Sequence, residues 1–123
     1  MGPGRRTRVA TLEQPETGAY CCPRYHEAVE LVGKRWTGAI LYVLLHGGRL
    51  RFTEIAQAVP DLSDRLLSER MKELEQRGIV ERHVSQGPPA KVCYELTEKG
   101  RQLAPALLEI KAWADRWLDT PAD

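Results

Sequence analysis

The chain of 123 residues has few cysteines and no long apolar run. Its three cysteines, Cys21, Cys22 and Cys93, are too few and too irregularly spaced for the disulfide framework of a small secreted domain, so we expect free thiols. No apolar stretch approaches the roughly 20 residues that span a bilayer, and the polar N-terminus lacks the apolar segment of a secretory signal. These absences predict a cytoplasmic protein that does not contact a membrane.

The sequence also lacks the motifs of common enzymes and metal sites. It has no glycine-rich phosphate loop, no nucleophile elbow and no plausible pair of catalytic carboxylates. His26, His46 and His83 lie on different predicted elements, and neither a paired C-x-x-C nor an H-E-x-x-H spacing is present. We therefore expect no catalysis, no bound metal and no cofactor.

What is present is the composition of one ordinary globular domain. Hydrophobic residues make up 42% and charged residues 28% of the chain, and a chain of this length buries one compact core. Residues 1–19 are polar and rich in proline and glycine, so we interpret them as a flexible arm before a folded domain at residues 20–120. The arm's Arg5, Arg6 and Arg8 could reach DNA, or the arm could be a disordered end that binds nothing.

Apolar residues recur at helical spacing in the first half of the domain. The pattern predicts a helix over residues 23–32 and a second, apolar nearly all round, that runs from Trp36 to the glycines at 47 and 48. After a short extended stretch at residues 49–51, a third helix is predicted, with Thr53 as its cap and Pro60 as its end.

A fourth helix is predicted over residues 64–77. Ser63 is a strong N-cap candidate, and Gly78 stands where left-handed geometry commonly ends a helix. At 100° per residue, one side of this helix is apolar and the other polar. The apolar side holds Leu67, Met71 and Leu74, and the polar side holds Arg65, Ser68, Glu69, Lys72 and Gln76.

The rest of the chain predicts a hairpin and a terminal helix. Two β-like runs, residues 79–84 and 91–96, flank a turn that contains two prolines. Thr97 caps the last helix, and Pro105 is expected to kink or restart it. The apolar seam of this helix, with a second apolar edge beside it, is more surface than one small core can cover. We therefore expect a second copy of the chain to cover it, which gives a homodimer.

The order helix, helix, short strand, helix, helix, hairpin, helix is that of a winged helix-turn-helix, a mainly α fold with a small β-hairpin wing. In that motif the second helix enters the major groove of double-stranded DNA with its N-terminus first. The alternative is an amphipathic helix and a hairpin whose outer sides contact only solvent. The predicted DNA-binding residues are Arg51, Ser63, Arg65, Ser68 and Lys72, with Gln86 and Lys91 from the wing.

Five stretches of the chain resemble the successive signatures of HxlR-type regulators. They are Cys22-Pro23, LVGKRW at 31–36, RFTEI at 51–55, LLSERMKELE at 66–75 and VCYELTEKG at 92–100, with Trp113 near the end. The resemblance spans about residues 20–118. It implies a dimeric winged-helix repressor or activator that pairs through its first and last helices and binds palindromic operators.

Cys22 is the candidate reactive residue, with Cys21 beside it. A helix N-terminus and the nearby Arg24 would favour its thiolate. In the HxlR resemblance Cys22 matches the functional cysteine because it directly precedes Pro23, and in thiol-sensing members that residue reacts with quinones, aldehydes or disulfide stress. This chain has no cysteine near its C-terminus, unlike some of those members. The alternative is that Cys21 and Cys22 pack at the dimer interface, and Cys93 is expected to be structural.

A small-ligand sensor is the other reading of the same fold. Tyr25, Trp36, Tyr94 and Trp113 could line an apolar pocket near the dimer interface, or they could be plain core residues. In the first case the inducer is a small apolar ligand, and in the second the response depends on thiol chemistry with a small electrophile.

Overall fold

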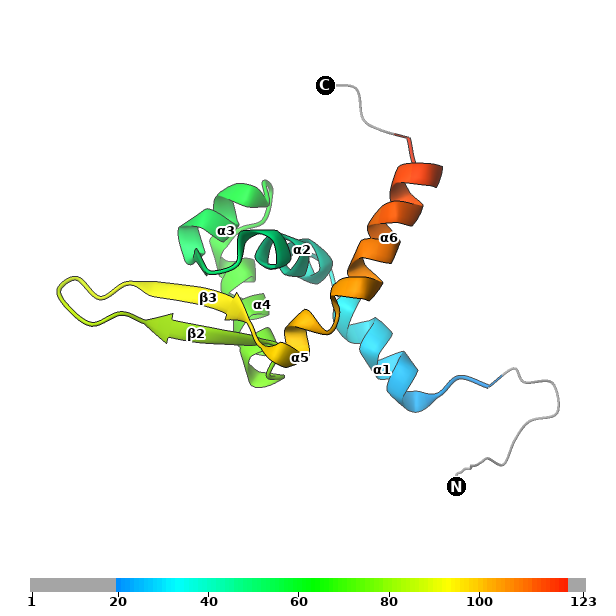
Figure 1. Cartoon of the computed structure of the whole chain (residues 1–123), viewed down its shortest axis with the longest axis horizontal. Coiled ribbons are helices and arrows are strands. Elements are labelled where there is room, and N and C mark those ends of the chain that lie inside the picture. The colour runs from blue at the N-terminus through cyan, green and yellow to red at the C-terminus, as the bar shows by residue number, and fades with distance from the viewer. Residues whose placement is uncertain (1–19, 120–123) are drawn as a thin grey trace. The chain divides into compact units, whose positions relative to one another are not determined.

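The computed structural model describes residues 20–119, which form two compact units that divide between Gly33 and Lys34. The first unit contains α1 (Pro23–Val32), as predicted. The second contains all the other elements (Figure 1). The predicted arm at residues 1–19, with its three arginines, lies outside the described residues. The predicted single domain at 20–120 spans both units and stays a prediction.

Helix α2 (Thr37–Gly47) supplies much of the core of the second unit. Ile40, Leu41 and Leu44 on it are almost fully buried. The prediction that Trp36 lies inside this helix is wrong. Trp36 has a φ of 76°, in the left-handed region that a right-handed helix excludes, so the helix begins one residue later.

Helix α3 (Phe52–Ala58) begins one residue before its predicted cap. The prediction that Thr53 caps it is therefore wrong. Arg51 occupies the capping position in extended backbone, and its backbone N–H donates to Oε1 of Glu54 at 2.7 Å. A carboxylate in the first turn thus accepts the backbone N–H of the residue that precedes the helix, which is the return bond of a capping box.

Helix α4 (Asp64–Gln76) is present as predicted and ends one residue earlier than expected. The Ser63 hydroxyl accepts a hydrogen bond from the Leu66 backbone N–H at 3.1 Å, and Gly78 has a φ of 73° just beyond the helix. Leu67, Met71 and Leu74 are buried, as the apolar side predicted. The helix therefore has one fixed orientation, with its polar side outward.

The predicted hairpin is part of a three-stranded antiparallel sheet. Its strands are β1 (Leu50–Arg51), β2 (Val80–Val84) and β3 (Val92–Leu96), in the order β1-β3-β2. The hairpin β2–β3 extends past the helices beside it (Figure 1). Cys93 pairs with both Arg51 and His83, so these three share one face of the sheet, and Arg82, paired with Tyr94, lies on the other.

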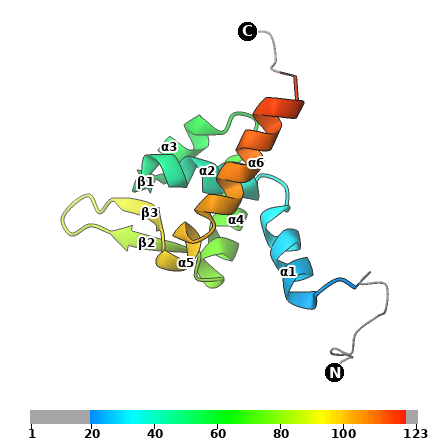
Figure 2. The same ribbon diagram turned by 45° about the vertical axis from the view of Figure 1, so that its right-hand side comes forward.

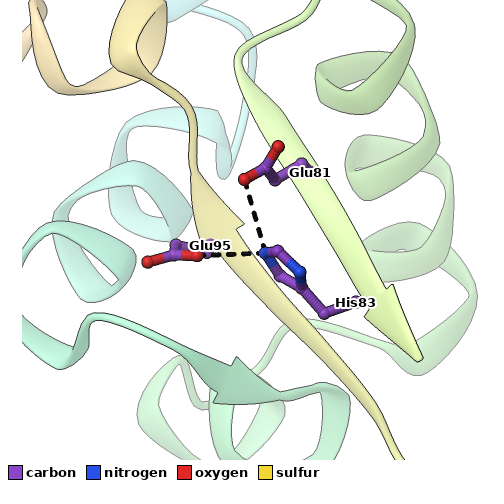
Figure 3. Close-up of side chains that lie close together, drawn as sticks. All are labelled: Glu81, His83 and Glu95. Carbon is purple, nitrogen blue, oxygen red and sulfur yellow. Dashed lines mark hydrogen bonds and ion pairs between the residues drawn. The ribbon is translucent and has the colours of Figure 1, made fainter. Parts of the chain in front are cut away.

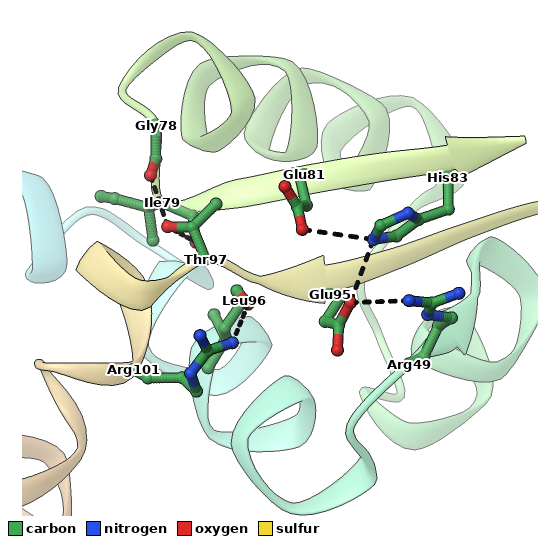
Figure 4. Close-up of polar contacts among 9 residues, drawn as sticks. All are labelled: Arg49, Gly78, Ile79, Glu81, His83, Glu95, Leu96, Thr97 and Arg101. Atoms are coloured by element: carbon green, nitrogen blue, oxygen red, sulfur yellow. Dashed lines mark hydrogen bonds and ion pairs between the residues drawn. The ribbon is translucent and has the colours of Figure 1, made fainter.

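The terminal segment is two helices, α5 (Glu98–Arg101) and α6 (Ala104–Trp117). Thr97 caps α5 by accepting from the Gly100 N–H at 3.1 Å, and its hydroxyl donates to the Gly78 carbonyl at 2.6 Å (Figure 4). Pro105 lies in the first turn of α6, so the predicted restart is confirmed.

Helix α6 buries none of its residues, although its first part packs beside α2 (Figure 2). Leu108, Ile110, Trp113 and Trp117 on it are between 44% and 66% exposed. This is the excess apolar surface that the sequence predicted. No helix among residues 20–119 is both long enough and apolar enough to cross a bilayer.

Candidate nucleic-acid interface

Two cations of α4, Arg65 and Lys72, are exposed to solvent. The Arg65 side chain is 90% exposed and forms an ion pair with Glu69, one turn along, with Nε 3.5 Å from Oε2. Lys72 is exposed on the same side of the helix. Ser63 is exposed too, but its hydroxyl is occupied by the cap. The Arg65 and Lys72 side chains, which could reach a DNA groove, are therefore not covered by other described parts of the chain.

A tight corner sets the direction of α4. Leu62 is buried and its N–H donates to the Val59 carbonyl at 3.4 Å. Asp61 between them has a φ of 74°, a conformation that aspartate tolerates better than most residues. This corner and the buried side of α4 fix how the N-terminus of the helix projects.

Two contacts fasten α4 to the segment that enters α2. Lys34 Nζ lies 3.1 Å from Glu73 Oε1, and Arg70 Nε donates to the Arg35 carbonyl at 2.9 Å. The Arg35 guanidinium in turn lies 5.1 Å from the ring centroid of Trp36. Because the Arg70 guanidinium is hydrogen-bonded to the Arg35 carbonyl, Arg65 and Lys72 are the cations of α4 best placed to bind an anion outside the protein.

A first hollow, which we call the inner hollow, lies between α4 and the hairpin. It brings the predicted Ser68 and Lys72 together with Arg82 of β2. Arg82 was not among the predicted site residues. The inner hollow is lined by Ser68, Met71, Lys72, Glu75, Arg82 and Tyr94.

A second hollow, the outer hollow, lies beside the hairpin. It brings together the predicted Arg51 and Lys91, and adds Arg49 and Arg82. Four cations, from β1 and the residues before it, from β2 and from the start of the β3 segment, thus line one concave surface. Such a surface suits a phosphate backbone. The outer hollow is lined by Arg49, Arg51, Arg82, His83, Val84, Ser85, Lys91 and Cys93. Gln86 is exposed in the hairpin turn and lines neither hollow.

The sequence missed Arg49 and Arg82 because no motif marks them. Arg49 is close to the predicted Arg51, and β alternation would put both on one face of a strand. Arg82 becomes informative only when the register opposite Tyr94 is known. Arg82 is among the residues that line each hollow, so both hollows border on β2.

Cys22 stands at the N-terminus of α1, in the first unit. It occupies the N-cap position and is half-buried, whereas Cys21 is exposed. Hydrogen bonds from the backbone N–H groups of Tyr25 and Arg24, and then from the Arg24 side chain, lower the pKa of the Cys22 thiol below its ordinary value. The structure thus gives Cys22 a partly accessible thiol at a helix N-terminus, beside an arginine. Its reaction with oxidants or quinones stays a prediction.

Alkylation of Cys22 should therefore reach its half-maximal rate at a pH below that of an ordinary cysteine, near 8.5. Only the thiolate reacts, and a lowered pKa keeps the thiolate populated at lower pH. The rate of iodoacetamide labelling is measured against pH in a Cys21→Ser/Cys93→Ser background. Arg24→Gln should move the midpoint upward. A midpoint at or above that of free cysteine would contradict the assignment.

The structure does not bring the four candidate pocket aromatics into one described hollow. Tyr94 lines the inner hollow, which contains none of the other three. Trp113 is 56% exposed on α6, and Trp36 is half-buried before α2. Tyr25 is exposed on α1, in the other unit. A ligand pocket made from these residues stays a prediction.

Most of the chain is similar to known helix-turn-helix transcriptional regulators. The HxlR-like helix-turn-helix family model matches residues 31–122. YvaP of Bacillus subtilis (strain 168), an uncharacterized HTH-type transcriptional regulator, is 50% identical over 98 residues, which are 80% of this chain and 90% of YvaP. The HTH-type transcriptional regulator YodB of the same organism is 47% identical over 106 residues, which are 86% of this chain and 93% of YodB.

Solved structures of YodB match the fold. The reduced form has a TM-score of 0.72 and 47% identity, and covers 85% of this chain and 100% of that one. The diamide-treated form has a TM-score of 0.67 and 46% identity, with coverage of 81% and 98%. The quinone-bound form has a TM-score of 0.68 and 46% identity, with coverage of 79% and 100%.

Proposed function

The chain belongs to the HxlR family of helix-turn-helix transcriptional regulators, and from that premise we propose that it is a repressor that binds a palindromic operator as a homodimer and leaves it when Cys22 reacts. The observation that carries the DNA-binding part is the exposed, cationic side of α4, with Arg65 and Lys72 outward and two hollows beside it that contain further cations. A groove and its flanking phosphates present the complementary charge and shape.

The proposed contacts divide by chemistry. Arg65, near the N-terminus of α4, is the candidate base reader, because an arginine can donate two hydrogen bonds to guanine O6 and N7. Lys72 and Ser68 would contact phosphate, as would the cations of the outer hollow. Gln86, in the hairpin turn, would contact the DNA backbone or the adjacent minor groove.

The exposed apolar residues of α6 support the homodimer. Four large apolar side chains on one helix are costly to leave in water, and α1 in the other unit also buries none of its residues. A two-fold dimer of this kind would place two copies of α4 on successive half-sites, which explains why we propose a palindromic operator.

Arg65→Ala should weaken binding to the operator by about 1–3 kcal/mol and relax preference at one base position. The operator is first selected from a random duplex pool, and affinities are then measured by gel shift at graded salt. Lys72→Ala is the matched variant: it should weaken binding to all sequences alike and reduce the slope of log affinity against log salt by about one. Unchanged selectivity in Arg65→Ala would refute base reading by this residue.

The proposed switch is chemistry at Cys22. YodB is known in diamide-treated and quinone-bound forms, and this chain carries a thiol of lowered pKa at the N-terminus of α1. A quinone would accept the sulfur electron pair by addition to its ring and form a thioether. Adjacent cysteines form a direct disulfide only with strain, so oxidation is expected to join Cys22 to a thiol of a second copy.

A further inference from the structure

Three potential metal ligands lie together on one face of the hairpin (Figure 3). Nε2 of His83 is 3.0 Å from Oε1 of Glu95 and 3.4 Å from Oε1 of Glu81. One ligand atom from each of the three residues lies within 4.8 Å of the other two. Two ligand atoms that are each about 2.1 Å from a tetrahedral Zn²⁺ are about 3.4 Å apart, so this spacing is close to the one that the ion needs.

The register of the sheet places these side chains together. Glu81 of β2 stands directly opposite Glu95 of β3, and His83 follows Glu81 by two residues, which puts it on the same face. Two like charges directly opposite each other on paired strands are destabilising. A cation between the two carboxylates would remove that repulsion, and the imidazole nitrogen of His83 is already directed at the point between them.

The carboxylate of Glu95 makes two contacts, with Arg49 and with His83. Arg49 Nη2 donates to Glu95 Oε1 at 3.1 Å (Figure 4), and this hydrogen bond is the largest cause that lowers the pKa of Glu95. Both the Arg49 and the His83 contacts use Oε1. Oε1 of Glu95 is therefore the oxygen at which these contacts meet, and it is the one whose spacing from Nε2 of His83 suits the ion.

We propose that Glu81, His83 and Glu95 form a binding site for a divalent transition metal ion of the Zn²⁺ class, with water in the remaining coordination position. One imidazole and two carboxylates are a donor set that suits Zn²⁺ better than Ca²⁺ or Mg²⁺, which prefer oxygen ligands alone. The three side chains are 55%, 33% and 31% exposed, so an ion can enter without opening the fold. A bound ion would tie β2 to β3 in the middle of the hairpin.

Binding of Zn²⁺ alone, without DNA, tests this site independently of the proposed regulatory function. The experiment uses the whole chain with Cys21→Ser and Cys22→Ser, because those thiols could themselves bind the ion. Calorimetric titration should show one saturable Zn²⁺ per chain. Removing a residue that only hydrogen-bonds to a metal ligand costs about 10–100-fold in metal affinity. Removing a ligand itself should cost at least as much, so His83→Gln and Glu81→Gln should each weaken Zn²⁺ binding by at least about tenfold.

Two matched variants should leave the affinity unchanged. His26→Gln removes an exposed histidine of α1, and Cys93→Ser removes the thiol that shares a face with His83. Zn²⁺ should also raise the melting temperature of the background protein but not that of His83→Gln, whose fold is checked by circular dichroism. No saturable binding, equal binding by His83→Gln, or loss of binding in Cys93→Ser would each overturn the assignment.

Discussion

Diamide should release the parent protein from its operator and leave the Cys22→Ser variant bound. We expect the oxidant to weaken the parent's affinity at least about tenfold, or about 1.4 kcal/mol, and the variant's affinity hardly at all. Diamide takes one hydrogen from each of two thiols and joins their sulfurs. Cys22 is the thiol with the lowered pKa, so its thiolate should be the one that reacts first. Serine keeps the size of the side chain and lacks this chemistry.

The comparison needs DNA affinity before and after oxidation, with release measured by gel shift or fluorescence anisotropy. Cys93→Ser is the matched control, because Cys93 lies in the second unit on β3, and this variant should respond as the parent does. A quinone, which needs only one thiol, should give the same ranking of the variants. If Cys22→Ser is released as readily as the parent, Cys22 is not the switch, although the DNA-binding proposal would stand.

Gly100→Ala should lower the free energy of unfolding by about 1–3 kcal/mol, and therefore the melting temperature by several degrees. A Cβ on Gly100 would overlap the Ile79 carbonyl oxygen and lie 3.2 Å from side-chain atoms of both Ile79 and Leu96. That oxygen cannot move freely, because it accepts the Thr97 N–H at 2.9 Å. The higher helix propensity of alanine recovers at most about 1 kcal/mol of this loss.

Gly47→Ala is the matched control, because it is the same substitution in another helix of the same unit. The Cβ there would meet the Leu50 side chain, 2.5 Å from its Cδ1. The Leu50 side chain, including its Cγ at 2.9 Å, can shift by rotation about its own bonds, whereas a hydrogen-bonded backbone carbonyl cannot, so Gly47→Ala should destabilise less. Equal melting temperatures for the two variants would contradict the importance of the contact between α5 and the start of β2.

Local signals in the sequence were sufficient to predict most of the elements. Ser63 and Thr97 act as caps as expected, Gly78 adopts the left-handed conformation, and Pro105 restarts the terminal helix. Each of these depends on one residue and its immediate neighbours along the chain, so a single sequence contains the information. The buried side of α4 follows in the same way from helical spacing.

Features that depend on pairing between distant segments were not predictable. The outer hollow combines Arg49, just before β1, with Arg82 of β2, and the Glu81 and Glu95 pair exists only in one register of β2 and β3. Trp36 shows a second kind of limit. Apolar periodicity placed it in a helix, but its backbone is left-handed where the chain contacts α4 through Lys34 and Arg35. Tertiary contacts decided the conformation there.

The outer position of β2 in the sheet bears on solubility. An outermost strand offers unpaired backbone groups to any passing strand, which is a common start of aggregation. Here three successive residues of that strand, Glu81, Arg82 and His83, carry ionisable side chains, and two prolines follow in the turn. Edge-to-edge growth of the sheet along β2 is thereby opposed.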